Sequence, residues 1–256
     1  MGKSICVSGS KGGIGKTTTS INLALSLFNK KENVVLLDAN FTSPNVGIYL
    51  GHPVTPNSIH EVLSNKIKLD EAMYLHKSGL KIIPGNISLN SLQNVNPSRL
   101  KNHVSKLKKE YDWVIIDSAA GLGRESLSAL EACDEVLVVL NPELPSVTDA
   151  LKTIRIAQEL NIGVAGVVLT RKRKKYDMTI KEIESMLESP VVAVIPEDDL
   201  IRKAQNKRDA VINLFPRSKV SKGYNRLSSY LLSESPGRNE KEFTWKDMVR
   251  TILGLK

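Results

Sequence analysis

The fold of this chain is decided by one stretch, Ser10-Lys11-Gly12-Gly13-Ile14-Gly15-Lys16-Thr17-Thr18. A short apolar run, Ile5-Cys6-Val7, precedes it, and an amphipathic segment from Ile21 to Phe28 follows it. Strand, glycine-rich loop and helix in this order form the context that a phosphate-binding loop needs. Glycines allow positive φ, and a helix N-terminus presents unpaired N–H groups to an anion. We therefore predict that the whole stretch binds a nucleotide.

Two side chains of this loop have specific predicted roles. Lys16 would reach the β- and γ-phosphates, and the Thr17 hydroxyl would bind Mg²⁺. The general phosphate-loop pattern has a glycine where this chain has Ser10, and a second lysine, Lys11, begins the glycine run. The alternative is a glycine-rich turn without a ligand, but two lysines and a threonine pair rarely arise at this spacing by accident.

The composition limits the class of protein. With 256 residues, of which 41% are hydrophobic, the chain forms one large α/β domain or two small ones. We expect no membrane-spanning segment and no secretory signal. Cys6 and Cys133 are expected to lie far apart as reduced core thiols, and the histidines lack metal-ligand spacing. The net charge of +9 favours anionic partners, namely nucleotides, anionic lipids or nucleic acids.

Short apolar strands alternate with helical segments along the chain. Residues 34–37 are apolar and end in Asp38, and residues 113–116 are apolar and end in Asp117, as in a Walker B strand. Asp117 would hold Mg²⁺ through a water molecule. The pattern predicts an α/β P-loop NTPase fold, with a mostly parallel twisted sheet and helices on both faces. Ligands of such folds bind at the carboxyl ends of the strands, where Asp38, Asn40 and Asp117 lie.

The remaining elements follow from the same patterns. Strands are expected at residues 80–85, 135–140, 164–169 and 191–195. Helices are expected at residues 59–63, 69–75, 97–110, 146–160, 179–188, 198–207 and 218–232.

The loop motif, Lys-Gly-Gly-x-Gly-Lys-Thr at residues 11–17, resembles the deviant Walker A motif of the MinD/ParA ATPases. Residues 117–121 are similar to the family's switch II, with Ala119 in place of a proline, and residues 141–149 look like its next conserved loop and helix start. The likeness extends from Ile5 to about Leu232 and is stronger for MinD than for ParA. It implies an ATPase that uses ATP and Mg²⁺ and forms a homodimer on ATP binding.

The resemblance also implies roles for individual residues. Lys11 would cross the dimer interface to the partner's nucleotide, Asp149 would pair with this lysine, and Gly121 would act as a switch hinge. The adenine would be enclosed by two segments, which are Thr170-Arg171 and Pro196-Glu197-Asp198.

One departure from the family concerns Asn40. The family's switch I has the pattern Asp-x-Asp, and this chain has Asp38-Ala39-Asn40. The implied catalytic residues are Lys11, Lys16, Asp38 and Asn40. Asparagine retains a carbonyl acceptor but loses the charge that positions the attacking water. We therefore predict slow hydrolysis and a long-lived ATP-bound dimer, unless Asp38 or a water network fills the role.

The C-terminal residues differ in composition from the predicted ATPase domain, residues 1–232. Residues 233–243 form a polar linker, and residues 244–256 fit an amphipathic helix. Its apolar face holds Trp245, Met248, Val249, Ile252 and Leu253. The alternative is a terminal helix packed on the core. The MinD likeness favours a membrane anchor instead, which implies a cytoplasmic protein associated peripherally with the inner face of the cell membrane.

Other functions fit parts of the sequence. A ParA-like ATPase bound to DNA would use the basic run at residues 171–175 and the basic residues that follow. A metal-cluster carrier needs paired cysteines, which we do not expect here. An ATP-binding scaffold with negligible turnover agrees with Asn40. The MinD likeness favours the positioning of a cellular structure such as the division site, with an unidentified activator or cargo protein.

Overall fold

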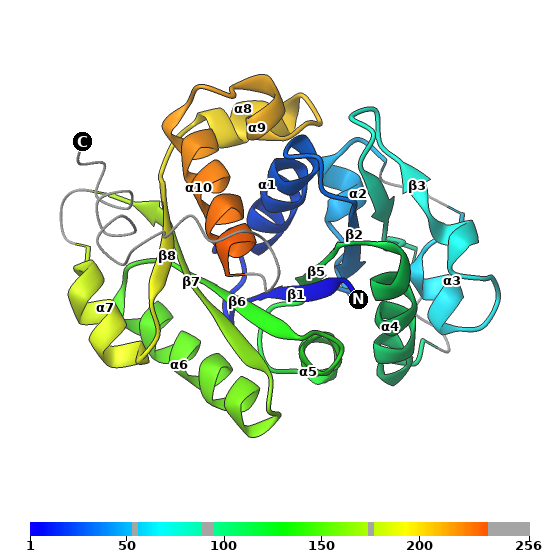
Figure 1. The fold of residues 1–256 in the computed structure, drawn as a ribbon, viewed down its shortest axis with the longest axis horizontal. Helices are drawn as coiled ribbons and strands as arrows, with labels where there is room; N and C mark the ends of the chain where they lie inside the picture. Colours follow the sequence, from blue (N-terminus) through cyan, green and yellow to red (C-terminus); the bar gives the residue numbers. More distant parts are fainter. Residues whose placement is uncertain (53–55, 89–94, 174–176, 235–256) are drawn as a thin grey trace.

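The structure, a computed structural model, describes residues 1–52, 56–88, 95–173 and 177–234. Its centre is an eight-stranded sheet in the order β3-β4-β2-β5-β1-β6-β7-β8 (Figure 1). The strands are β1 (Lys3–Ser8), β2 (Val34–Ala39), β3 (Tyr74–Leu75), β4 (Lys81–Ile83), β5 (Trp113–Ser118), β6 (Glu135–Leu140), β7 (Gly163–Lys172) and β8 (Val191–Pro196). Neighbouring strands run parallel except for the antiparallel pair β3 and β4. The predicted α/β fold is confirmed.

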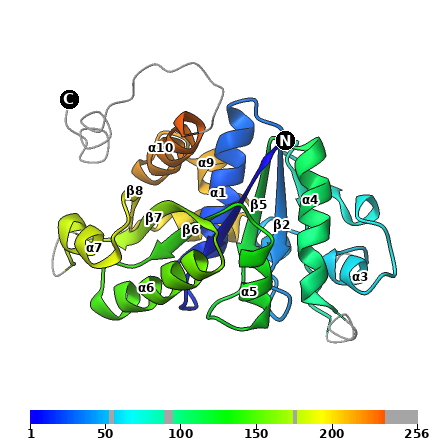
Figure 2. The ribbon, with the colours of Figure 1, turned by 60° about the horizontal axis from the view of Figure 1, so that its bottom comes forward.

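Helices cover both faces of this sheet. They are α1 (Lys16–Asn29), α2 (Val46–Tyr49), α3 (Ile59–Leu63), α4 (Leu100–Glu110), α5 (Arg124–Glu131), α6 (Leu144–Glu159), α7 (Ile180–Leu187), α8 (Leu200–Asn206), α9 (Val211–Leu214) and α10 (Lys219–Ser233). Two 3₁₀ turns are η1 (Asp70–Ala72) and η3 (Pro97–Arg99). One face packs against α1, α8, α9 and α10, and the other packs against α4, α5, α6 and α7 (Figures 1 and 2).

The central strands are buried on both faces because helices cover both. Every residue of β2 and β5 is buried, which explains their continuous apolar sequences. Polar residues occur only at the carboxyl ends of these two strands, where Asp38 and Asp117 lie opposite each other in the β2–β5 register. The fold therefore places two carboxyl groups side by side at the edge where the loop after β1 also lies.

Two predicted helices differ from the structure. Residues 69–75 form η1 and then β3, because pairing of Tyr74 and Leu75 with β4 outweighs the local helical pattern. The helix predicted to start at Ser146 starts at Leu144 instead, with Pro145 in its first turn, where a missing N–H costs nothing. Ser146 does not cap this helix, since its hydroxyl accepts a hydrogen bond from the Asn141 N–H at 3.1 Å.

The two cysteines are close together, contrary to our expectation. Cys6 on β1 and Cys133 after α5 are buried in the same apolar cluster, and both are free thiols. The pKa of the Cys6 thiol lies well above its usual range because of its hydrogen bond with Cys133, and burial adds to this effect. The expectation of reduced core thiols agrees with this environment.

The predicted C-terminal segments lie largely outside the described residues. Helix α10 continues to Ser233, the first residue of the predicted linker. Residues 235–243 of the predicted linker and the whole predicted helix at 244–256 lie outside the described residues. Among the described residues, no helix is both long and apolar enough to cross a membrane.

Candidate functional site

The glycine-rich loop connects β1 to α1 and leaves the N-terminus of α1 open. Gly13 and Gly15 have φ values of 75° and 98°, which only glycine adopts readily. Gly15 caps α1 without a side chain, so the first N–H groups of the helix have no side-chain acceptor. At Gly12 and Gly13 an added Cβ would have no atom within 4 Å, so the backbone faces open space. The loop can therefore present its N–H groups to an anion.

Lys16 extends back over this loop. Its ammonium group donates a hydrogen bond to the Lys11 carbonyl at 2.9 Å, and its side chain is buried. Burial lowers the pKa of Lys16, and the negative charge of Asp117 opposes this effect. A buried ammonium group with one carbonyl partner has spare donors for phosphate oxygens. Lys16 thus has the position predicted for a lysine that binds phosphate.

Thr17 and Asp117 form the most direct polar contact of the site. The Thr17 hydroxyl donates to the Asp117 carboxylate at 2.7 Å, and the Ser20 hydroxyl donates to its other oxygen at 2.8 Å. Burial raises the pKa of Asp117 to about 6, although both hydroxyl groups and Lys16 oppose this shift. A carboxylate and a hydroxyl at this separation are the oxygen donors that Mg²⁺ prefers. The residues present fit the predicted magnesium site.

The Asp38 side chain is held by the loop that follows β2. Its carboxylate is fully buried and accepts hydrogen bonds from the backbone N–H groups of Asn40, Asn45 and Val46 at 3.0–3.1 Å. Burial and the neighbouring Asp117 raise the pKa of Asp38 to about 8. Asp38 therefore stabilises the loop between β2 and α2, and, like Asp117, it does not line the cavity.

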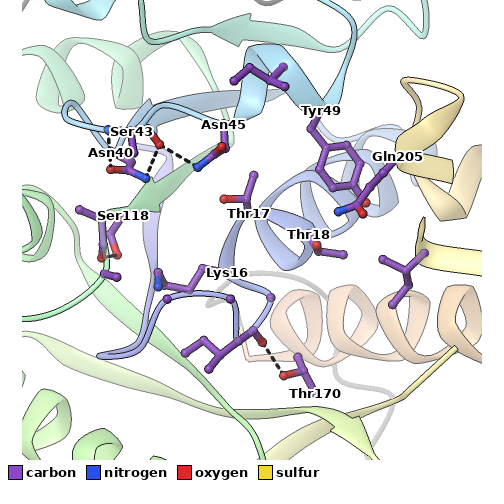
Figure 3. A pocket seen from close by; sticks show the side chains of 18 of the residues that line it. Lys16, Thr17, Thr18, Asn40, Ser43, Asn45, Tyr49, Ser118, Thr170 and Gln205 are labelled. Carbon is purple, nitrogen blue, oxygen red and sulfur yellow. Dashed lines mark hydrogen bonds between the residues drawn. The ribbon is translucent and has the colours of Figure 1, made fainter. Parts of the chain in front are cut away.

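Asn40 lies at the cavity, but its side chain binds its own loop. Its amide nitrogen donates to the Ser43 carbonyl at 2.6 Å, and its amide oxygen accepts from the Ser43 N–H at 3.3 Å (Figure 3). Both polar ends of Asn40 are thus in use. Thr42 in the same loop donates to Glu125 of α5 through its hydroxyl at 2.5 Å and its N–H at 3.1 Å. The loops after β2 and β5 are therefore linked.

A cavity of about 1250 Å³ joins these parts. The loop from Gly12 to Thr18 lines its centre, and residues from the two halves of the sheet, on opposite sides of β1, line its two ends. On the β5 and β2 side lie Asn40, Thr42, Ser118 and Arg124, and on the β7 and β8 side lie Thr170, Arg171, Glu197 and Asp198. Figure 3 shows Lys16 between Ser118 and Thr170.

The predicted adenine residues surround the second end. The Thr170 hydroxyl donates to the Ile14 carbonyl at 2.6 Å, which fastens β7 to the phosphate loop. Arg171 has a positive φ of 53°, and Glu197 forms an ion pair with Arg173. Asp198 accepts a hydrogen bond from the Leu200 N–H at 2.9 Å. Pro196 ends β8 but is not part of the cavity wall.

The residues assigned to a dimer interface are not joined within one chain. The Asp149 carboxylate pairs with Lys152 at 3.2 Å, so the expected pairing with Lys11 does not occur in this structure. Ser10 and Lys11 do not line the cavity, and the Ser10 hydroxyl lies 3.5 Å from that of Thr153 on α6. Gly121 has a φ of 84° and open space around it, as a hinge requires.

Sequence reasoning missed several residues of the site. Ser20 is one turn after Lys16 on α1, and this spacing could have indicated its contact with Asp117. Arg124 and Glu125 follow the glycines of the switch segment directly, and these charges were the available signal. Tyr49 and Gln205 also line the cavity, near Thr18 (Figure 3), but no local pattern connects them.

Comparison with protein families gives two matches. Residues 2–164 match the AAA domain family. Residues 127–252 match the family of 4Fe-4S iron sulfur cluster binding proteins of the NifH/frxC type. In the described ranges, no group of three or more His, Cys, Asp or Glu side chains is placed to hold a metal ion.

Individual proteins resemble the chain over nearly its whole length. An uncharacterised ATP-binding protein of Methanocaldococcus jannaschii is 31% identical and covers 100% of this chain and 98% of its own. The septum site-determining protein MinD of Thermotoga maritima is 31% identical, with 98% and 96% covered. The solved structure of MinD from Pyrococcus horikoshii, a complex with Mg-ADP, superposes with a TM-score of 0.87 at 29% identity, with 90% and 96% covered.

Proposed function

This chain belongs to the MinD/ParA family of P-loop ATPases, and we propose on that basis that it is a MinD-like, ATP-dependent dimerising switch. In this proposal, it hydrolyses ATP slowly, associates with the membrane in its ATP-bound form and positions a cellular structure such as the division site. ATP and Mg²⁺ are the ligands of its site. The observation that carries the proposal is the contact of Thr17 with Asp117 at 2.7 Å beside an open phosphate loop.

The chemistry of the proposed reaction is the transfer of the terminal phosphoryl group to water. Lys16 and the N–H groups of the loop would stabilise negative charge on the phosphates. Thr17 and Asp117 would hold Mg²⁺, which neutralises phosphate charge when bound. Asp38 would keep the loop after β2 in the shape that carries Asn40 into the cavity. Catalysis of this kind depends mainly on position and electrostatics.

A proposed second subunit would complete the site. The Lys11 carbonyl accepts a hydrogen bond from the Lys16 ammonium group. Lys11 does not line the cavity of its own chain. Its side chain is therefore available to the nucleotide of a second copy. Asp149 is paired with Lys152, an exposed residue, and this weak pair could exchange for one with Lys11 in the dimer.

Slow hydrolysis is proposed from the environment of Asn40. The nitrogen and the oxygen of its side-chain amide both form hydrogen bonds with the Ser43 backbone. Asparagine also carries no charge with which to orient a water molecule. ATP would then remain bound for a long time, which would prolong the dimer. The ATP-binding scaffold without turnover is the extreme form of this proposal.

Membrane association is proposed from the sequence of residues 244–256, which fits an amphipathic helix of the kind that binds in the interface of a bilayer. One such short helix binds a bilayer weakly. Two such helices in one dimer would bind much better through avidity. The proposed location is the cytoplasm, with peripheral attachment to the inner face of the cell membrane. An activator or cargo protein, as yet unidentified, would control the cycle.

A second candidate, non-specific DNA binding, has one observation in its favour. Exposed basic side chains lie on or beside α8 and α10, and they are Arg202, Lys203, Lys207, Lys219, Lys222 and Arg226. Such a surface could contact phosphates of duplex DNA. Retention on DNA that falls steeply with salt would favour this candidate.

Co-sedimentation with vesicles tests the main proposal. The full chain and a chain truncated after Ser233 are incubated with anionic vesicles in Mg-ATP or Mg-ADP. We expect the full chain to pellet with ATP, to pellet several-fold less with ADP, and the truncated chain to remain in the supernatant. Equal pelleting in all these conditions would refute the link between nucleotide and membrane. A light-scattering mass measured in both nucleotides reports separately on the dimer.

A further inference from the structure

We propose that Arg124, the first residue of α5, binds the terminal phosphate of ATP and makes this site prefer ATP to ADP. The inference rests on the proposed function, since it takes ATP to be the occupant of the cavity. It assigns a substrate-contacting role to a residue outside the phosphate loop. The reasons are its position in the cavity, its free charge and its link to the loop after β2.

The position of Arg124 corresponds to the phosphate end of the cavity. Arg124 lines the cavity together with Thr42, which follows β2, and Ser118, which ends β5. These strands lie on one side of β1, and β7 and β8 lie on the other. The Thr17–Asp117 pair, which would hold Mg²⁺, also lies on the β5 side. A nucleotide with its magnesium there would direct its terminal phosphate toward Arg124 and its base toward β7 and β8.

The charge of Arg124 is available for a ligand. The side chain is exposed, and no hydrogen bond or ion pair involves it within the described part of the chain. The nearest acid in sequence, Glu125, is already occupied by the hydroxyl and the N–H of Thr42. A guanidinium group has five donors in a planar fork that matches phosphate oxygens, and it stays charged at all relevant pH values.

Lys16 alone does not distinguish ATP from ADP. The lysine of such a loop lies over the β- and γ-phosphates, so it contacts a phosphate of either nucleotide. A preference for ATP needs a cation that reaches only the terminal phosphate. Arg124 lines the cavity from the start of α5, outside the phosphate loop, and in this proposal it meets this requirement.

The contact would also hold two loops in place. Gly121 has a φ of 84°, and Gly121 and Gly123 have open space around them, so the segment before α5 can move. Glu125 ties the first turn of α5 to Thr42. When Arg124 binds the terminal phosphate, the starts of α5 and of the loop that carries Asn40 are fixed together. Loss of that phosphate would release both, which is the behaviour expected of a nucleotide switch.

Equilibrium binding of ATPγS and ADP in the presence of Mg²⁺ tests the assignment on the full chain. We compare wild type with Arg124→Gln and Arg124→Lys by titration calorimetry. A lost charged hydrogen bond should weaken ATPγS binding by about tenfold or more in Arg124→Gln and change ADP binding by less than about twofold. Arg124→Lys should recover part of the loss, because it keeps the charge but not the fork.

Two arginine variants serve as matched controls. Arg226 on α10 is exposed and does not line the cavity, so Arg226→Gln should bind both nucleotides as wild type does. Arg202 lines the end of the cavity where the base would bind, so Arg202→Gln should change the affinity for both nucleotides by the same factor. Equal loss of both nucleotides in Arg124→Gln, no loss of either, or the same ATPγS-selective loss in Arg202→Gln would overturn the assignment. If wild type bound neither nucleotide, the proposed function itself would fail.

Discussion

At the scale of single residues, the site depends on how Asp117 is surrounded. Two hydroxyl groups donate to its carboxylate, Lys16 lies nearby, and water is excluded. A buried carboxylate is costly without such partners, so removal of one of them affects both the acid and its ligand. Thr17 has the larger consequence, because its hydroxyl would also reach Mg²⁺.

Thr17→Ala should weaken the binding of Mg-ATP by about ten- to hundredfold, since the variant loses a magnesium ligand and leaves Asp117 with one hydroxyl partner. In EDTA the same variant should bind ATP nearly as wild type does. Calorimetric titration in both buffers measures this difference. Thr148→Ala on α6 is the control, because it removes an exposed threonine hydroxyl that does not line the cavity. The same loss with and without Mg²⁺ would contradict the assigned role.

Asn40→Asp should raise the turnover number for ATP by about tenfold or more, because a carboxylate can orient and polarise the attacking water. Phosphate release at saturating Mg-ATP is the measurement. Asn102→Asp on the exposed side of α4 adds the same charge elsewhere and serves as the control. A turnover no faster than wild type would show that Asn40 does not limit hydrolysis.

At the scale of elements, the strand ends and their loops explain the site better than any motif does. Asp38 ends β2, Asp117 ends β5, and the β2–β5 register pairs them directly. The loop after β2 folds around Asp38 through three N–H groups and is tied to α5 through Thr42 and Glu125. A substitution at the end of β2 or of β5 is therefore expected to alter the conformation of the loops that follow both strands.

This arrangement predicts a pH dependence. The folded pKa values of Asp38, about 8, and Asp117, about 6, both lie above the ordinary value of 3.8. Stability from these groups is complete below the ordinary value and is lost as the pH rises through the folded values. The melting temperature of the protein in EDTA should therefore fall between pH 5 and about 8.5, as scanning fluorimetry can measure.

Asp38→Asn should flatten this pH profile, although its melting temperature at pH 5 should be lower because an amide replaces an acceptor of three N–H groups. Asp70→Asn in η1 is the matched control and should keep the wild-type slope. A variant at Asp38 with an unchanged slope would mean that the burial of this acid does not cause the dependence.

Local sequence patterns predicted the elements that local physics determines. The phosphate loop, the apolar strands and helices such as α4 and α10 follow from glycine placement and periodicity. The contact of Cys6 with Cys133 and the Thr42–Glu125 link join residues distant in sequence, and no local signal specifies them. The hydrogen bonds of the Asp38 carboxylate to N–H groups of its own loop were also not foreseen.

At the scale of the whole molecule, the nucleotide cavity is lined from both halves of the sheet, on either side of β1. The cavity has one end on the β2 and β5 side of β1 and the other on the β7 and β8 side. A ligand that contacts both sides stabilises the fold as a unit, since it binds the native state and not the unfolded chain. Mg-ATP should therefore act on global stability as well as on the loops.

We expect Mg-ATP at about one hundred times its dissociation constant to add about 2.7 kcal/mol to the free energy of unfolding. For a domain of this size the gain corresponds to a rise in melting temperature of about 5–10 °C. Thermal scans with increasing Mg-ATP measure the rise, and Lys16→Ala should remove most of it. A melting temperature independent of Mg-ATP would argue against nucleotide binding at this site.

The central place of β1 has a consequence for how the protein is made. This strand leaves the ribosome before the other strands of the sheet, yet its partners are β5, whose register begins at Trp113, and β6, which begins at Glu135. At a synthesis rate of about 5–20 residues per second, the apolar first strand waits on the order of 5–20 seconds for its first neighbour. During that interval its edges are unpaired. The protein should therefore need chaperone protection early in translation, and a nascent chain stalled before β5 should be its most aggregation-prone form.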